Sequence, residues 1–542
     1  MAGSHVFVTM GDVTNIACDA WLLPSDRHSK VRPHWLRDVP GLDTALPAHH
    51  CPEFDDGRVL VNPLTGWPVE EPMPIPTAGP FQATEQVEDF RPALRSFIAA
   101  GARHARIRRK ERDSRAAASD AGRHGSADAP RLAAARPNPL LAMPLFGTGG
   151  GGAGAVRGDA MRQLLEQARE SAAEHGVDVV LVLKDEKDFA MAEAIRRRTA
   201  GWWDELEEDL QRRAVELADI AHAGQLVPFM GGGVSISAGG PSWKQLLRRL
   251  AVRAGLEPEA RDRLALKNPL DQASILRRIF EDSGLEDFNT AIARELDLPR
   301  YGLAPALLAT LPTTQSITLN YDSLFEMAAD DAGLPRTVIP EEATSRSARW
   351  LLKLHGSVTR PESIVLTRDD YLGYNSRRDA LSALVKATFI TQHLLFVGFG
   401  LADDHFHEIV HAVQQALPRD EQSHPELATA LTLFVDPLDR RAWENRLELV
   451  PMSRSEERDV PEAARTLEIF LDMLLAHATD SHSYLLADGY YEALTEDEKS
   501  LRAKLLSLAG NLGDGEWGSS GGRLLAQMLA TFGLPEESER RL

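Results

Sequence analysis

Strand-like apolar runs alternate with helical patterns along two stretches of the chain. In the first stretch these runs are "HVFVTM", "ACDAWLLP", "LLAMP" and "VDVVLVL", and the segment between the last two has apolar residues at helical spacing. From Gln225 onward the strand-like runs are "LVPFM", "SITLN", "LLKLHG", "HLLFVGFG" and "TLFVDP", with helical segments such as "SWKQLLRRLAVRAGL" between them. Strands that alternate with helices are typical of parallel sheets covered on both faces. The pattern therefore predicts two three-layer α/β domains.

Helical patterns separate and follow these two domains. The segment from Asp204 to Ala223 is amphipathic, and Gly224 is a suitable C-terminal cap for it. After about Met452 the pattern is helical throughout, for example in "PEAARTLEIFLDMLLAHA". The predicted organisation is a first α/β domain at 1–200, a linker helix in 201–224, a second α/β domain at 225–452 and a helical C-terminal region at 453–542.

One segment of the first domain has no clear period. Residues 102–137 are rich in Arg, Ala, Ser and Asp. Such composition predicts a solvated, partly disordered insertion. The alternative is a basic RNA-binding arm, but the segment lacks the aromatic residues that stack on bases.

Composition and charge narrow the class of protein. The chain of 542 residues carries a formal net charge of −20, which argues against general binding to nucleic acid or to a membrane surface. Its two cysteines, Cys18 and Cys51, cannot form a four-cysteine zinc site. The start has no secretory signal pattern, and no apolar run approaches the roughly 20 residues that span a bilayer. We therefore expect a soluble, cytoplasmic protein without zinc.

A glycine cluster follows the first strand of the second domain. Residues 231–244 read "GGGVSISAGGPSWK" directly after "LVPFM". Glycines at a strand end allow a backbone to approach a phosphate with its N–H groups free, and serine hydroxyls add donors. A helix is expected to begin after Ser242, with Trp243 just inside it. The phosphate contacts predicted on this basis are Gly231, Gly232, Gly233, Ser235 and Ser237.

These residues resemble, position by position, the first motif of sirtuins, G-A-G-x-S-x-x-A-G-I-P-x-F-R. Three further segments resemble later sirtuin motifs in the same order: "TLNYDSLFE", "KLHGS" and "FVGFGLADDH". The resemblance covers about 225–452 and implies a Rossmann-like, NAD-binding fold. Trp243 and Lys244 stand where the family has Phe and Arg. The resemblance assigns catalysis to Asn320 and His355, and further NAD contacts to Trp243, Asp322, Gly398, Gly400 and Asp436.

The residue types suit cleavage of the bond between nicotinamide and ribose. This reaction passes through an oxocarbenium-like state, as other glycoside cleavages do. The amide of Asn320 can hold a water or a ribose hydroxyl without adding a full charge, and His355 can accept a proton. Asp322 would orient Asn320, and Trp243 would cover the nicotinamide side and control the access of water.

One departure from the sirtuins concerns zinc. Protein-deacylating sirtuins carry a four-cysteine zinc module that helps to build their acyl-peptide groove. Here "VTRPESIVLTRDDYLGY" follows His355, and we expect it to form a short hairpin-like segment without cysteines. This layout resembles the bacterial sirtuin-like branch whose members hydrolyse NAD during anti-phage defence.

The first domain resembles macro domains, which bind ADP-ribose. The resemblance lies in "GDVTNIACDAWLLPSD", near the start, and in the later loop "MPLFGTGGGG". Ser25 and Asp26 replace the asparagines of the family's N-A-A-N segment, which favours binding over hydrolysis of ADP-ribosyl groups. A scaffold without any ligand is the alternative. The ligand contacts that the resemblance implies are Asp12, Val13, Gly147, Thr148, Gly149, Gly150, Gly151 and Gly152.

Three functional hypotheses follow. The favoured one is a regulated NAD hydrolase of bacterial defence, acting by abortive infection through NAD depletion, with the macro-like domain as sensor of an ADP-ribose-type nucleotide. The second is an NAD-dependent protein deacylase or ADP-ribosyltransferase, and the third is a non-catalytic nucleotide-binding regulator. The resemblance also implies a homo-oligomer and an activator encoded by the defence operon or by the phage.

Overall fold

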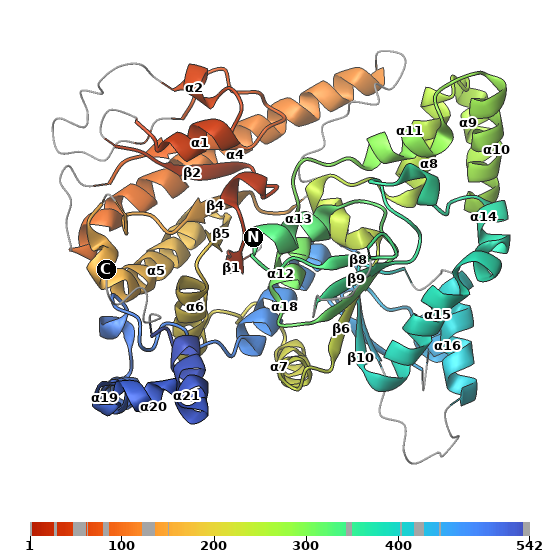
Figure 1. The fold of residues 1–542 in the computed structure, drawn as a ribbon. Helices are drawn as coiled ribbons and strands as arrows, with labels where there is room; N and C mark the ends of the chain where they lie inside the picture. Colours follow the sequence, from red (N-terminus) through yellow and green to blue (C-terminus); the bar gives the residue numbers. More distant parts are fainter. Residues whose placement is uncertain are drawn as a thin grey trace.

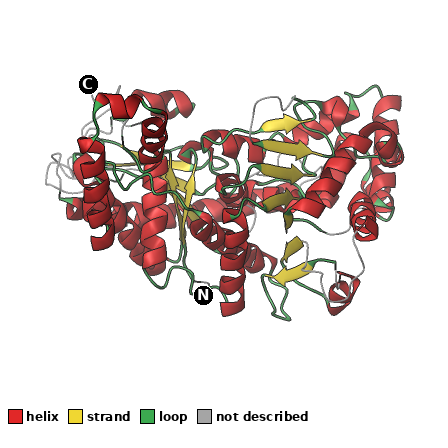
Figure 2. Cartoon of the chain, turned by 60° about the horizontal axis from the view of Figure 1, so that its bottom comes forward, coloured by secondary structure: helices red, strands yellow, loops and turns green. Residues whose placement is uncertain are grey.

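Two α/β units lie side by side, and each is built on one parallel sheet (Figure 1). Helices cover both faces of each sheet, and further helices follow at the C-terminus (Figure 2). The predicted fold class is therefore confirmed. The computed structural model describes residues 3–26, 30–46, 61, 63–79, 86–121, 136–149, 151–342, 349–400, 404–416, 428–443 and 446–534.

The first unit has a five-stranded sheet of order β1-β5-β4-β2-β3, with all pairs parallel. Strand β3 was not predicted, because its sequence "MPIPT" contains two prolines. Proline is tolerated there because β3 lies at the edge of the sheet. The strands are β1 (Val6–Met10), β2 (Ala20–Pro24), β3 (Met73–Thr77), β4 (Leu140–Pro144) and β5 (Asp178–Leu183). The helices are α1 (Pro33–Asp38), α2 (Leu42–Ala45), α4 (Arg91–Ala121), α5 (Arg157–His175) and α6 (Glu186–Arg198).

Helix α4 contradicts the predicted disorder of residues 102–121; residues 122–135 lie outside the described part of the chain. The arginines that looked like a solvated basic run hold a buried carboxylate. Arg109 Nη2 lies 2.7 Å from Asp19 Oδ2, and Arg112 Nη2 lies 2.7 Å from Asp19 Oδ1. Arginines three positions apart share one face of a helix, so both reach the same partner. These two contacts attach the segment to the start of β2, where the sequence pattern had predicted a solvated insertion.

Replacing Asp19 with Asn is expected to destabilise the first unit in a pH-dependent way. Burial alone would raise the pKa of Asp19, but Arg109 and Arg112 outweigh it and lower the pKa below its ordinary value of 3.8. The carboxylate therefore stabilises the fold fully above about pH 4, and this contribution is lost as the pH falls further. At neutral pH the variant should unfold with about 3–5 kcal/mol less free energy than the wild type. Thermal unfolding measured from neutral to acidic pH checks this, and a difference that does not shrink in acid would contradict it.

The second unit has a seven-stranded sheet of order β12-β11-β10-β6-β7-β9-β8, again with all pairs parallel. Its strands are β6 (Leu226–Met230), β7 (Gln315–Thr318), β8 (Thr337–Ile339), β9 (Trp350–Lys353), β10 (His393–Val397), β11 (Ala428–Thr432) and β12 (Glu448–Pro451). Its helices are α8 (Trp243–Arg253), α9 (Pro258–Ala265), α10 (Pro269–Asp282), α11 (Phe288–Leu296), α12 (Leu303–Thr310), α13 (Leu324–Asp331), α14 (Arg368–Leu372), α15 (Tyr374–Thr391), α16 (Asp404–Ala416) and α17 (Pro437–Trp443).

Two local predictions in this unit are wrong. The strand expected at "TLFVDP" ends at Thr432, so the apolar residues that follow form a loop. The segment after His355 is no hairpin: it forms the short 3₁₀ helix η5 (Pro361–Ser363) and then α14. Thr367 caps α14 through a reciprocal capping box with Asp370, a local signal that competes with strand formation.

The order of the second sheet identifies its ligand-binding edge. Strand β6 lies between β10 and β7, and the chain runs from β6 toward β7 but from β10 toward β11. In open parallel sheets, ligands bind beyond the carboxyl ends of the strands where the connections diverge in this way. That position here is the junction of β6 and β10.

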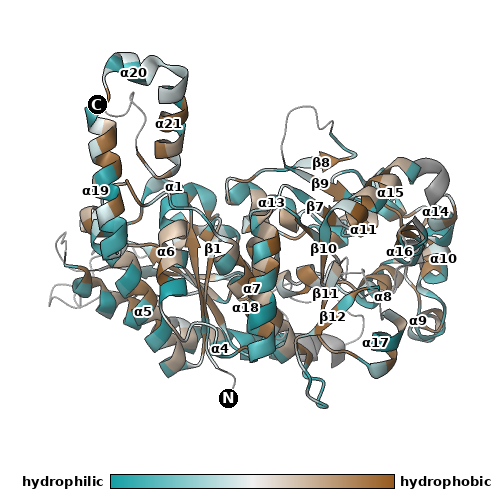
Figure 3. Cartoon of the chain, turned by 90° about the horizontal axis from the view of Figure 1, so that it is seen from below, coloured by the Kyte–Doolittle hydropathy of each residue, from teal (hydrophilic) through white to brown (hydrophobic). Residues whose placement is uncertain are grey.

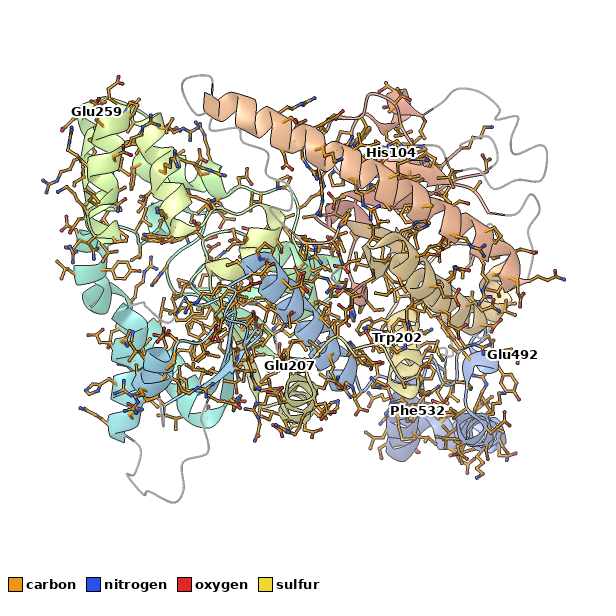
Figure 4. The ribbon with its side chains drawn as sticks, turned by 180° about the vertical axis from the view of Figure 1, so that it is seen from behind. His104, Trp202, Glu207, Glu259, Glu492 and Phe532 are labelled. Atoms are coloured by element: carbon orange, nitrogen blue, oxygen red, sulfur yellow. The ribbon has the colours of Figure 1, made fainter. Side chains whose placement is uncertain are left out.

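Helices α7 (Glu208–His222) and α18 (Val460–Ala478) pack against each other between the two units. Figure 4 shows this pair from behind, with Glu207 at the start of α7. Buried ion pairs and a hydrogen bond connect α18 to the first unit. Asp472 pairs with Arg196 and lies 2.9 Å from His5 Nε2. Arg465 pairs with Asp178 on β5 at 2.9 Å. Helix α18 is therefore part of the junction between the units.

The remaining C-terminal helices project from the first unit, as Figure 3 shows. They carry several exposed apolar side chains, among them Leu501 at 45 % and Leu524 at 67 % exposure. In the described part of the chain, no helix combines the length and apolarity needed to cross a membrane. The three helices are α19 (Glu496–Asn511), α20 (Asp514–Gly518) and α21 (Ser520–Thr531).

The first unit's "GDVTN" segment contacts the second unit directly. The hydroxyl of Tyr301 accepts a hydrogen bond from the Asp12 N–H at 3.2 Å and donates one to Asp331 at 2.9 Å. The Tyr301 backbone donates to the Asn15 carbonyl at 3.0 Å and accepts from the Ala17 N–H at 2.8 Å. The loop with the predicted ADP-ribose motif is therefore bonded to the start of α12.

Candidate nucleotide site

The two glycine loops at the ends of β6 and β10 interlock. Gly231 N–H donates to the Val397 carbonyl at 2.9 Å, and Gly233 N–H donates to the Gly398 carbonyl at 2.8 Å. A Cβ on Gly233 would lie 2.7 Å from Gly398 Cα. The prediction that these N–H groups are free for a phosphate is therefore wrong for Gly231 and Gly233. Glycine is required because the two loops approach each other too closely for a side chain.

A cavity of about 880 Å³ opens beside these loops. Four predicted residues line it: Gly233, Ser237, Gly398 and Gly400. Its other walls come from the loop after β11, from α17 and from α18. The volume falls within the range of small-molecule sites.

Three residues of the cavity wall each carry a buried polar atom that lacks a hydrogen-bond partner in the described part of the chain. Among the described residues, Ser237 Oγ, Thr432 Oγ1 and Arg136 Nε are buried without a hydrogen-bond partner. All three residues line the cavity. Such groups are costly to bury unpaired, so a ligand that bonds to them would recover that energy.

Sequence reasoning missed part of this cavity. Arg136 precedes β4 in the first unit, and Glu468 lies on α18; both were outside the predicted NAD domain. The amphipathic pattern of α18 was visible, but nothing in it indicates which face meets a ligand. Charged residues on an apolar helix face, such as Arg465 and Glu468, were the available signal.

Three other predicted contacts, Asp436, Trp243 and Gly232, are not among the residues that line this cavity. Asp436 accepts a hydrogen bond from the Leu438 N–H at 2.8 Å and keeps 44 % of its side chain exposed, while Asp439 lines the cavity. Trp243 is the first residue of α8 and packs on an apolar cluster that includes Tyr321. Gly232 is exposed, and a Cβ there would meet no described atom within 4 Å.

The predicted catalytic residues lie at equivalent positions beyond neighbouring strands. In the pairing of β7 with β9, Thr318 is the partner of Lys353. Asn320 and His355 each follow two residues after that pair, at the carboxyl ends of adjacent parallel strands. The sheet thus brings the two residues to the same edge, next to the glycine loop of β6.

The amide of Asn320 is held by hydrogen bonds. Its Nδ2 donates to the Gly231 carbonyl at 3.1 Å and to Ser235 Oγ at 3.2 Å. Ser235 Oγ in turn donates to Asp322 Oδ2 at 2.8 Å. Asp322 was predicted to orient Asn320, and in the structure it is connected to Asn320 through Ser235. Ser235 thus connects Asn320 with Asp322 and is not among the residues that line the cavity.

The loop that carries His355 is fixed on both sides. His355 is 4 % exposed, and its ring lies edge-on to Tyr371 with 5.4 Å between the centroids. The Arg378 guanidinium donates to the Leu354 carbonyl at 2.6 Å and to the Ser363 carbonyl at 2.5 Å. A Cβ on Gly356, whose φ is 93°, would lie 2.2 Å from the Ser363 carbonyl oxygen. Backbone packing therefore sets the position of the imidazole.

The cavity next to the site predicted in the first unit is smaller than the cavity in the second unit. A cavity of about 200 Å³ lies beyond β1, β4 and β5 and includes Gly11 and Val13, which is below the usual range for ligand pockets. Asp12 does not line it: its carboxylate caps the short helix η1 (Val13–Asn15) and accepts from Lys184 Nζ at 2.5 Å. Burial alone would raise the pKa of Asp12, but Lys184 and Thr14 outweigh it and lower the pKa.

The glycine loop after β4 folds on itself. Gly152 N–H donates to the Gly149 carbonyl at 3.2 Å, and Gly147 has a φ of 85°. A Cβ on Gly151 would lie 2.5 Å from the Gly147 carbonyl oxygen. Like these glycines, Thr148 is absent from the lining of the 200 Å³ cavity, and Gly150 lies outside the described residues. The macro-like ligand site stays a prediction. Across the described ranges, no three His, Cys, Asp or Glu side chains are grouped to hold a metal ion.

Comparisons with known proteins match the second unit. Residues 314–452 match the model of the SIR2-like domain family. Over 219 residues, 39 % of this chain and 21 % of the relative, the sequence is 29 % identical to Defense-associated sirtuin 2 of Bacillus subtilis. Over 208 residues, 36 % of this chain and 41 % of the relative, it is 28 % identical to NAD(+) hydrolase ThsA of Bacillus cereus (strain MSX-D12).

A further relative is NAD(+) hydrolase ThsA of Acinetobacter baumannii (strain 532279), 24 % identical over 204 residues, or 36 % of this chain and 40 % of the relative. The aligned stretch spans less than half the length of each of these relatives. Residues 314–452 of the second α/β unit are therefore similar to the SIR2-like domain family, and the chain is similar to a bacterial defence-associated sirtuin and to bacterial NAD(+) hydrolases.

Proposed function

We propose that the second unit hydrolyses NAD to nicotinamide and ADP-ribose. The observation that carries the proposal is the placement of Asn320 and His355 at equivalent positions beyond β7 and β9, next to a cavity whose lining includes hydroxyls without a partner among the described residues. The relatives named NAD(+) hydrolase support the same reaction.

In this proposal the cavity takes the adenosine and phosphate part of NAD. Thr432 and Ser237 supply hydroxyls, and the apolar residues of α17 and α18 cover the base. The nicotinamide ribose then extends past Gly231 to Asn320, because the amide of Asn320 bonds to the Gly231 carbonyl. The interlocked glycine loops form the floor between the two parts of the site.

The bond between nicotinamide and ribose breaks, and positive charge develops on the ribose. Asn320 orients the attacking water or a ribose hydroxyl through its amide. His355 accepts the proton that the water loses as its oxygen bonds to the ribose carbon. Nicotinamide leaves with the electron pair of the broken bond, so that NAD and water give nicotinamide, ADP-ribose and a proton.

The proposal extends to regulation. We place the enzyme in bacterial anti-phage defence, where NAD depletion kills the infected cell, with the first unit as sensor of an ADP-ribose-type nucleotide. The bonds between Tyr301 and the "GDVTN" loop support a coupling of the two units. Homo-oligomerisation through the exposed leucines of α19 and α21, together with an activator from the defence operon or the phage, completes the proposal.

Incubation of the purified full-length chain with NAD tests the proposed reaction. Chromatography should show equal amounts of nicotinamide and ADP-ribose, with the wild type compared to Asn320→Ala and His355→Ala. NAD cleavage is measured in three settings: with the chain alone, with added ADP-ribose, and after expression of the chain in cells infected by phage. Absence of turnover in all three settings, or turnover that survives both substitutions, contradicts the proposal. Sedimentation velocity reports the oligomeric state in the same samples.

Replacing Ser237 with Ala is expected to weaken NAD binding without destabilising the protein. The hydroxyl is buried and unpartnered among the described residues, so its removal costs the free protein nothing. A hydrogen bond to a charged phosphate is worth about 1.5–3 kcal/mol, which corresponds to a Kd roughly 10- to 100-fold higher. Calorimetric titration of NAD into the His355→Ala chain, with and without Ser237→Ala, measures this effect. Ser507→Ala on α19 is the control, and an unchanged Kd for the Ser237 variant would remove Ser237 from the site.

A further inference from the structure

The ammonium group of Lys353 joins the ends of β9 and β7. Lys353 is the last residue of β9, is 1 % exposed and precedes His355 by two positions. Its Nζ donates to the Asp322 carbonyl at 2.6 Å, to the Tyr321 carbonyl at 3.3 Å and to Glu326 Oε1 at 2.6 Å. Three donors thus meet three acceptors, as a buried ammonium group requires.

Packing alone does not explain a lysine at this position. Leu351 and Leu352, its neighbours on β9, are fully buried and apolar. An apolar side chain would continue that pattern at lower cost, because a buried charge loses its hydration. The distinctive property of Lys353 is that it donates to two carbonyl groups of the loop that carries Asn320.

A short path leads from Lys353 to the amide of Asn320. The Asp322 carbonyl accepts from Lys353, while the Asp322 carboxylate accepts from Ser235 Oγ at 2.8 Å. Asn320 Nδ2 donates to the same Ser235 Oγ at 3.2 Å. Displacement of the Asp322 backbone would therefore move both hydrogen bonds that lead to the Asn320 amide.

The loop also touches the strand end that carries His355. Tyr321 donates its hydroxyl to the Val365 carbonyl at 2.8 Å, and the Val365 N–H donates to the His355 carbonyl at 2.9 Å. Lys353 lies on the strand that leads into His355, so it links the two catalytic positions from the sheet side while Tyr321 links them from the loop side.

We propose that Lys353 is a positioning residue of the NAD-cleaving centre, which holds the loop of Asn320 in place opposite His355 by donating hydrogen bonds to that loop's backbone. The inference rests on the proposed function and adds a residue to it. Lys353 acts through the loop and does not touch the substrate.

The test requires a variant that removes the ammonium group without leaving a buried charge behind. Lys353→Met alone would leave Glu326 without its partner, and burial already raises the pKa of Glu326 although Lys353 lowers it. The double variant Lys353→Met/Glu326→Gln removes both charges and keeps both volumes, and replacement of a complete pair is well tolerated. Glu326→Gln alone is the matched control, because the Gln oxygen still accepts from Lys353 and the carbonyl contacts persist.

Two measurements decide the outcome. Steady-state kinetics of the double variant should show kcat reduced at least about tenfold with little change in KM, because a displaced catalytic group affects the chemical step. Hydrogen exchange should show faster exchange of the amides from 319 to 324. Glu326→Gln should retain most of kcat, and Leu94→Ala in α4, a core substitution, should lower Tm without changing kcat.

The outcomes separate this inference from the proposed function. A double variant with wild-type kcat, or with unchanged exchange at 319–324, overturns the role of Lys353. A wild type that cleaves no NAD overturns the proposed function, and the exchange measurement then still decides whether Lys353 holds the loop. If Leu94→Ala loses as much kcat as the double variant for a similar fall in Tm, the loss of kcat reflects lower stability alone. Lys353 would then be a structural residue.

Discussion

Replacing His355 with Ala is expected to lower kcat for NAD cleavage by roughly 10²–10⁴-fold, the usual contribution of a general base. The imidazole is held by the backbone contacts of its loop and by the Tyr371 ring. KM should change little, since the cavity that takes the adenosine part lies at β6 and β10. Quantification of nicotinamide over time measures the effect.

Asn320→Ala should cause a loss of similar size, because the amide that orients the reacting water or hydroxyl is removed. Thermal unfolding should show that both variants remain folded, and His482→Ala in the exposed C-terminal region is the control with wild-type kcat. If either variant keeps more than about a tenth of the wild-type kcat, the role assigned to the residue that it replaces is incorrect.

Replacing Gly398 with Ala is expected to abolish NAD binding and to destabilise the second unit. Gly398 has a φ of 64°, and a Cβ there would lie 2.5 Å from the backbone nitrogen of Val234. The nearest atoms all belong to the backbone of Gly233 and Val234, so no flexible side chain can give way. One loop must therefore move away from the other. A strained backbone position costs about 1–3 kcal/mol, and the clash adds to it, so Tm should fall by more than about 4 °C.

Gly232→Ala is the matched control for stability, because a Cβ there meets no described atom within 4 Å. Its Tm should stay within about 1 °C of the wild type, since a surface substitution without strain changes stability little. Calorimetry with NAD reports binding for both variants. If Gly398→Ala binds NAD with wild-type affinity, the interlocked loops do not form the floor of the site.

Much of the secondary structure could be predicted because the signals are local. Strands such as β6 and β10 are mostly apolar, and α8 begins after Ser242 with a capping box to Gln245. The errors arose where tertiary contacts override local pattern. Strand β3 is paired in the sheet although two of its five residues are proline, and two arginines of α4 pair with the buried Asp19.

The sequence predicted which residues belong to the candidate site, but it did not predict how they contact one another. The motifs placed Asn320 and His355 at strand ends, and parallel strands bring their carboxyl ends to one edge, so their proximity followed from the fold class. The fold class did not indicate which backbone groups the glycine loop after β6 contacts. Gly233 and Gly398 are 165 positions apart in the numbering, and their close approach depends on β6 and β10 being neighbours in the sheet.

The sequence by itself determined the α/β class, the helical C-terminal region and the residues of the sirtuin-like motifs, because periodicity and motif order are properties of short segments. The tertiary structure alone decided that α18 and Arg136 close the cavity and that Lys353 holds the loop of Asn320. It also decided that Tyr301 joins the two units. Each of these contacts joins residues far apart in the chain, and burial favours the contacts because an unpaired buried charge or hydroxyl costs free energy.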